Sequence, residues 1–198
     1  MTLAIVIILP ALLGVSPGFG TPAASRAPAA SQAPAVSVEN RAVASQPGNV
    51  LTLEVGAQTT FTAVDRDRVQ SRAIDLQRIG EHLRGFVGDE ESDLRIERTR
   101  VSGHVGMRPV ALEVSRTGGG LDVHGVFGGR AIALAIEPTS IDGDAGPCHY
   151  KLKNRRGDYV GTADCGGAPT QVRLQLPVAL VTRTDPELAA ILVALFSS

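Results

Sequence analysis

The chain has 198 residues and a formal net charge of -1, with 19 basic and 20 acidic residues. This length suits one domain together with a targeting segment and a linker. The balanced charge lacks the basic excess typical of nucleic-acid binding, and only 4% of the residues are aromatic, with no tryptophan. The composition therefore argues against a nucleic-acid partner and against recognition of bases or sugars by stacking.

Residues 3–15 form an almost uninterrupted apolar run. A run of this length is typical of the apolar part of a signal peptide and is short for a membrane-spanning helix. Small residues follow, so we expect a signal peptide over residues 1–20, with cleavage between Gly18 and Ser25. Because no Lys or Arg precedes the run, an uncleaved N-terminal anchor is the alternative. The sequence predicts an exported protein, periplasmic or extracellular.

Residues 21–48 are rich in Ala, Pro, Ser and Gln, and residues 25–30 are nearly duplicated in residues 31–36. Such a segment buries too little apolar surface to offset the loss of chain entropy on folding. We expect a disordered tether here, which leaves residues 49–198 as a single folded domain.

Residues 50–55 and 59–64 alternate between apolar and polar residues, as paired strands do. Residues 65–83 are ambiguous, because their apolar positions also fit a helical stripe. Ile74-Asp75-Leu76 matches the apolar-x-apolar arm that recurs later in the chain. We therefore expect a strand over residues 72–77, with a helical turn before it as an alternative.

An apolar-x-Gly signature then recurs about every 18 residues, with one longer interval of about 22 residues. Its glycines are Gly85, Gly103, Gly125, Gly143 and Gly161. We expect them to make room for bulky neighbours on a crowded concave face, or to allow sharp coiling of the strands. The alternative is that they mark β-bulges.

The turns between these glycines fix a strand register. Gly128-Gly129 is a strong hairpin signal, because both residues can adopt positive φ. Folding there places Gly125 opposite Ile132 and Val123 opposite Leu134, with every apolar residue on one face. Turns at 106–107, 138–139, 146–147 and 156–157 give equivalent registers.

The last of these turns places Cys148 directly opposite Cys165. Opposed strand positions are close enough for a disulfide, and two cysteines in an exported chain most simply form one bridge. The closed loop of roughly 17 residues would stabilise the domain by about 3 kcal/mol in the chain-entropy model.

A short C-terminal helix is predicted over residues 185–196. Thr184 is a capping residue type, Pro186 suits the first turn, and Glu187 suits the positive end of a helix. The helix is apolar nearly all round. We expect it to cover the sheet or close one end of it.

The fold class predicted is therefore mainly β. It is an antiparallel up-and-down meander of about 11–13 short strands, built from repeats of about 18 residues and ending in a short helix. A meander this wide should curl into a barrel or fold into two packed layers. Charged outward positions argue against a transmembrane barrel, so no membrane span is expected apart from the alternative anchor.

The sequence contains no recognisable catalytic or cofactor motif. His82, His104, His124 and His149 lack the spacing of metal ligands, and His149 beside Asp164 and Lys151 is the least improbable exception. Residues 142–146 resemble a calcium loop only faintly. We expect no enzyme, no cofactor and no metal.

Three functions stay open. The first is a non-catalytic binding or structural role in the cell envelope. The second is a carrier of a small apolar ligand, such as a lipid, in a barrel interior. The cavity would be lined by Val123, Leu134, Ile141, Leu152 and Tyr159. The third is an unrecognised hydrolase, for which His124 and Asp142 would have to meet across the sheet.

Overall fold

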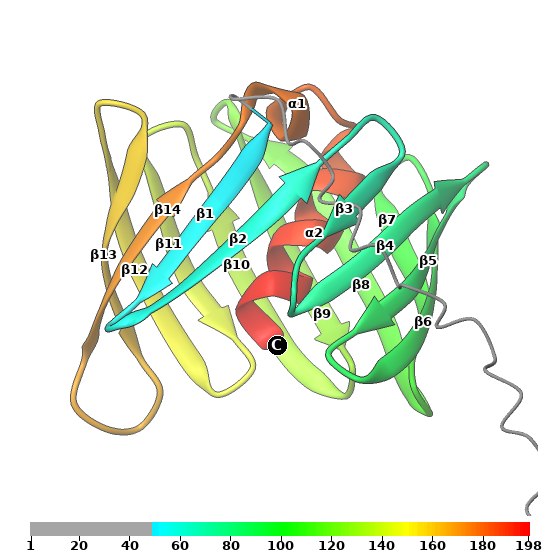
Figure 1. Ribbon diagram of the computed structural model, residues 1–198, viewed down its shortest axis with the longest axis horizontal. Coiled ribbons are helices and arrows are strands. Elements are labelled where there is room, and N and C mark those ends of the chain that lie inside the picture. Colours follow the sequence, from blue (N-terminus) through cyan, green and yellow to red (C-terminus); the bar gives the residue numbers. More distant parts are fainter. Residues whose placement is uncertain (1–48) are drawn as a thin grey trace, which may run out of the picture. The chain divides into compact units, whose positions relative to one another are not determined.

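The computed structural model describes residues 49–198. Fourteen antiparallel strands form one closed barrel, in which each strand pairs with its neighbours in the chain and β1 pairs with β14 (Figure 1). The prediction of a mainly β meander is confirmed, and of its two forms the barrel is the one observed. The expected signal peptide, residues 1–20, and tether, residues 21–48, lie outside the described residues.

The strands have the following bounds: β1 (Val50–Val55), β2 (Gln58–Val64), β3 (Arg68–Gln70), β4 (Ile74–Ile79), β5 (His82–Val87), β6 (Glu90–Ile96), β7 (Arg100–Val105), β8 (Arg108–Thr117), β9 (Gly120–Phe127), β10 (Arg130–Ile136), β11 (Ser140–Ala145), β12 (Cys148–Arg155), β13 (Asp158–Asp164) and β14 (Thr170–Gln175). Two helices follow, α1 (Val178–Val181) and α2 (Asp185–Ser197). The expected number of 11–13 strands was too low. Residues 65–83 contribute β3, which is too short to show an alternating pattern, as well as β4 and the start of β5.

The strand register agrees with the one expected from the turns. Gly125 pairs with Ile132 and Val123 pairs with Leu134 across β9 and β10. The registers about turns 106–107, 138–139, 146–147 and 156–157 are also those expected. Residues 72–77 overlap strand β4, so the preference for a strand over a helix was correct.

The signature glycines occupy places where two backbones come close, not where side chains crowd. A Cβ on Gly125 would lie 2.0 Å from the carbonyl oxygen of Ala111 on the neighbouring strand, and Gly125 has φ +139°. Gly85, Gly103, Gly143 and Gly161 show the same approach, at 1.9–2.0 Å from a carbonyl of the preceding strand. Strand pairing continues through all five, which rules out β-bulges there. Only glycine fits because any side chain would meet backbone.

This finding corrects the expectation of a crowded concave face. Gly103 and Gly125 are exposed to solvent, and Gly85 has the small Ser92 as one of its two neighbours. The other expectation, local coiling of the strands, agrees with the positive φ of four of the five glycines, Gly161 being the exception.

Helix α2 lies inside the barrel. Figure 1 shows it enclosed by the strands, and it contacts β7, β8, β9 and β11. Every residue from Pro186 to Phe196 is buried, as expected for a helix that is apolar all round. The helix covers the inner face of the sheet, as one of the two expectations had it, and does not close one end, because the barrel is wide enough to take it into the interior. Thr184 is the N-cap residue, but its side chain makes no capping hydrogen bond.

The apolar core is therefore a ring of inward side chains around a central helix. Ile132, Leu134 and Ile136 of β10 point inward and are buried, whereas Ala131 and Ala133 on the same strand are exposed. Neither helix in the described part of the chain is long and apolar enough to cross a membrane.

Candidate functional site

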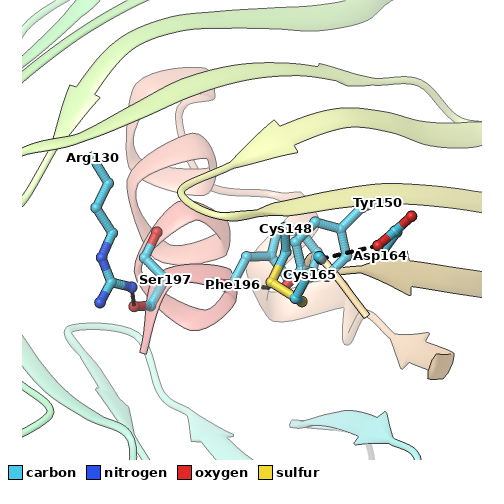
Figure 2. Close-up of a disulfide and its surroundings, with 8 residues drawn as sticks. Arg130, Cys148, Tyr150, Asp164, Cys165, Phe196 and Ser197 are labelled. Atoms are coloured by element: carbon cyan, nitrogen blue, oxygen red, sulfur yellow. Dashed lines mark hydrogen bonds between the residues drawn. A yellow bond between two sulfur atoms is a disulfide. The ribbon is translucent and has the colours of Figure 1, made fainter. Parts of the chain in front are cut away.

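The disulfide and the end of α2 form one structural unit (Figure 2). Cys148 at the start of β12 is bonded to Cys165, which follows β13, with their Cα atoms 4.0 Å apart. The pairing predicted from the register is confirmed. Cys165 is exposed and Cys148 is half-buried. A disulfide of this kind is consistent with an oxidising, extracytoplasmic compartment.

Tyr150 connects this strand pair to the helix. It lies two residues after Cys148, its ring stacks on Phe196 with centroids 4.4 Å apart, and its hydroxyl donates to the Phe196 carbonyl at 3.1 Å. Burial raises the pKa of Tyr150 above its ordinary value. Arg130 on β10 donates to the carbonyl of Ser197 at 2.7 Å, so two polar contacts hold the last turn of α2 (Figure 2).

The other end of α2 is held by charged groups. Glu187 is fully buried and accepts hydrogen bonds from Arg78, at 2.7 Å, and from Arg183. Asp185 accepts from Arg116 at 2.5 and 2.7 Å. The Arg116 guanidinium holds the pKa of the Asp185 carboxyl below its ordinary value. These contacts link the first turn of the helix to the barrel wall, that is, to the strands that surround it.

Two of the four histidines pair with nearby carboxylates. Nδ1 of His82 lies 2.6 Å from Asp93, and Nδ1 of His149 lies 2.8 Å from Asp144. The hydrogen bond from His82, together with the nearby Arg84, holds the pKa of Asp93 below its ordinary value.

The hydrolase hypothesis needed His124 near Asp142. The structure places His124 opposite Glu113 and Ala133, whereas Asp142 is opposite Ala135 and Lys151, on another row of the wall. His149 does lie opposite Asp164, but its nearest carboxylate is Asp144. The structure therefore does not bring these residues together into a catalytic arrangement.

The residues expected to line an apolar cavity belong to the core around α2. Val123, Leu134, Ile141 and Leu152 are at most 1% exposed and lie in the same buried cluster as the helix. Tyr159 lies at the barrel mouth, where it lines a surface cleft of about 320 Å³ with Leu188 and Val181. Its hydroxyl donates to the carbonyl of Glu137 at 2.9 Å, and burial raises its pKa.

Residues 49–198 contain no group of three or more His, Cys, Asp or Glu side chains arranged to hold a metal ion. Asp142 and Asp144, the carboxylates of the faint calcium loop, both face His149, at 3.9 Å and 2.8 Å. All three side chains are exposed, so they form a surface cluster of one imidazole and two carboxylates.

The fold defines the class of protein as a closed antiparallel β-barrel with an internal helix and one disulfide. Comparison of the chain with protein families, with curated proteins and with solved structures gives no match. Clues to function therefore come from the barrel itself.

Sequence reasoning missed the contacts at both ends of α2. The all-round apolar pattern of the helix did predict burial, but several placements bury a helix equally well. Glu187 was assigned only to the helix start, whereas its burial depends on Arg78, which is more than 100 residues away in the chain.

Proposed function

We propose that the chain is an exported domain, periplasmic or extracellular, with a non-catalytic binding or structural role. The observation that carries this proposal is the position of α2. The protein's own helix occupies the space that a carrier barrel keeps for its ligand.

The burial of the helix supports this view. Leu192 is fully buried and is one of eleven consecutive buried helix residues. The inward side chains of the wall therefore meet apolar partners from the same chain, with which they form one core. Since interiors of this kind are close-packed, contacts with other molecules would involve the outer wall and the turns.

The disulfide supports export. Cys165 is exposed, so cytosolic thiols would have access to the bond and would keep such a pair reduced. A bridge between two neighbouring strands persists in an oxidising compartment, where its contribution to stability is retained.

The proposal can be tested by native mass spectrometry of the full chain purified from the cell envelope of its host. We expect the mass of the protein alone. A co-purifying lipid, removable by organic extraction, would instead support the carrier hypothesis.

The Leu192→Ala variant provides a matched control. Removing a buried leucine side chain should cost about 2–5 kcal/mol and leave an apolar cavity, which benzene can enter. We expect benzene to raise the Tm of the variant and not that of the wild type. Stabilisation of the wild type to the same extent would indicate an interior already open to ligands.

Export can be tested separately by alkylating the protein taken from unbroken cells without a reductant. We expect Cys148 and Cys165 to resist labelling until a dithiol is added. Two labelled thiols before reduction would contradict an oxidising location.

A further inference from the structure

Strand β2 has an edge that the barrel does not pair. On one side, β1 pairs with β2 over the whole of Val50–Val55. On the other side, β3 pairs only with Ala63 and Val64 of β2. Figure 1 shows β2 and β3 diverging from this short paired region. Within residues 49–198, residues 58–62 therefore have no strand partner on the β3 side.

The short β3 has a local cause. Ser71 donates its backbone N–H to the carbonyl of Ile74 at 2.6 Å, and its hydroxyl accepts from the N–H groups of Ala73 and Ile74. These bonds turn the chain directly after Gln70. If pairing had continued, Arg72 would have lain opposite Phe61.

The hydrogen-bonding groups on this edge can be assigned from the alternation of an antiparallel ladder. Val64 donates to Asn49 on the β1 side at 2.8 Å, so Thr62 and Thr60 also face β1. Thr59 and Phe61 must therefore direct their N–H and C=O groups toward the open side. Both residues are exposed, Phe61 to 64%.

This edge lacks the usual protection against pairing with another chain. Natural edge strands carry Lys, Pro, a bulge or an inward charge. The sequence of β2 is QTTFTAV, with no charge and no proline, and it is rich in residues that favour strands. By contrast Phe86, another exposed aromatic, lies on β5, which pairs with β4 and β6 along its length.

We infer that this open edge of β2 pairs antiparallel with the same edge of a second copy of the chain. A two-fold axis beside Thr59 or Thr60 makes the contact self-complementary. Because β2 is uncharged, no register opposes like charges, and each register brings Phe61 near a threonine or alanine of the other copy.

Charge complementarity at the end of the edge favours a second copy over an unrelated peptide. Arg72 is exposed at the β3–β4 turn, and Glu54 on β1 lies beside Thr59. Antiparallel pairing brings β1 of the second copy toward the β3–β4 turn, so each Arg72 approaches a Glu54 of the other copy, which is flanked by Arg173 of β14 within its own chain. The contact is independent of the proposed function.

The paired segment is short, so the dimer is weak and depends on concentration. Stable interfaces bury roughly 1,200–2,000 Å², more than a few residues of strand edge can bury. Analytical ultracentrifugation of the full chain over a wide concentration range should therefore show a reversible monomer–dimer equilibrium.

The Phe61→Lys variant should weaken this dimer at least about tenfold, because lysine is the residue that natural edges use against pairing. Thr59→Pro, which removes an N–H on the open side and adds no charge, should act in the same way. Phe86→Lys is the matched control and should dimerise like the wild type. Circular dichroism checks that each variant is folded.

Amide exchange locates the contact. Protection of the Thr59 and Phe61 amides should increase with protein concentration. A wild type that stays monomeric at all concentrations would overturn the inference, as would a dimer that survives in both edge variants. Equal protection of the two amides at all dilutions would also overturn it, since it would show that the chain covers its own edge.

Discussion

The two ends of α2 are held inside the barrel by different chemistry. At the N-terminal end, Glu187 and Asp185 pair with three arginines. At the C-terminal end, Phe196 stacks on Tyr150 beside the disulfide. The comparison indicates that a helix with no polar side chains between its ends can be positioned in a barrel by contacts made at those ends. The two kinds of contact should fail under different conditions.

The largest effect is expected at the charged end. The Glu187→Gln variant leaves Arg183, whose side chain is only 6% exposed, without its countercharge. Breaking a buried pair in this way costs about 3–5 kcal/mol, which urea unfolding can measure. In Glu113→Gln, the control, the lost pair with Arg100 is exposed, so a loss below about 1 kcal/mol is expected. Equal losses of unfolding free energy in the two variants would show that the buried pairs of Glu187 stabilise the fold no more than an exposed pair does.

The next effect concerns the disulfide at the other end. The double variant Cys148→Ser, Cys165→Ser should be less stable than the wild type by about 3 kcal/mol, because its unfolded chain is no longer constrained. Wild type treated with a dithiol is the control and should lose a similar amount. If the strand pair transmits its order to the helix, amide exchange should increase more at Leu195 than at Ala189.

A smaller effect is expected for the hydroxyl of Tyr150. Tyr150→Phe keeps the ring stack but leaves the Phe196 carbonyl without this donor, at a cost of about 1 kcal/mol. Tyr159→Phe removes a similar bond, to Glu137, away from the last turn of α2. Both variants should lower Tm, but only Tyr150→Phe should speed amide exchange in that turn. Equal exchange rates in the two variants would show that the Tyr150 hydroxyl does not stabilise the last turn of α2.

The smallest effect is a difference in pH response. The folded-state pKa of Asp185 is lowered from 3.8. Its contribution to the stability of the fold is therefore present above that value and is lost as the pH falls through the folded pKa. The pKa of Tyr150 is raised from 10.0, so its contribution is present below that value and is lost as the pH rises through the folded pKa.

Melting curves across pH can distinguish these two contributions. Asp185→Asn should reduce only the acid loss of stability, by less than about 1 kcal/mol, because the ion pair is partly exposed. Tyr150→Phe should reduce only the alkaline loss. If Asp185→Asn changed the alkaline loss of stability, or Tyr150→Phe changed the acid loss, the assignment of these losses to the two residues would be contradicted.

Much of the wall could be predicted from the sequence because its determinants are local. Gly128-Gly129 and the other turns set the register, and the register in turn placed Cys148 opposite Cys165. Each of these inferences uses residues that are close in the chain. The period-2 pattern then fixes which face is buried.

The rest depended on contacts between distant residues. The closeness of Gly125 to the Ala111 carbonyl follows from the coiling of the wall, which no single repeat reveals. The interior position of α2 depends on the diameter of the closed barrel, and therefore on the number of strands. The ion pairs between the carboxylates of α2 and the arginines of the barrel could be predicted only once the position of the helix was known.

The position of α2 also constrains the order in which the domain folds. The helix follows all fourteen strands of residues 49–198, yet it supplies the centre of their core. Strand β1 also cannot complete its pairing until β14 has been synthesised, because Leu53 pairs with Leu174. During synthesis the first strands therefore lack both an edge partner and a core, and contacts so distant in sequence form slowly. The domain should remain unfolded until α2 has been made, so the export proposed above would act on an unfolded chain.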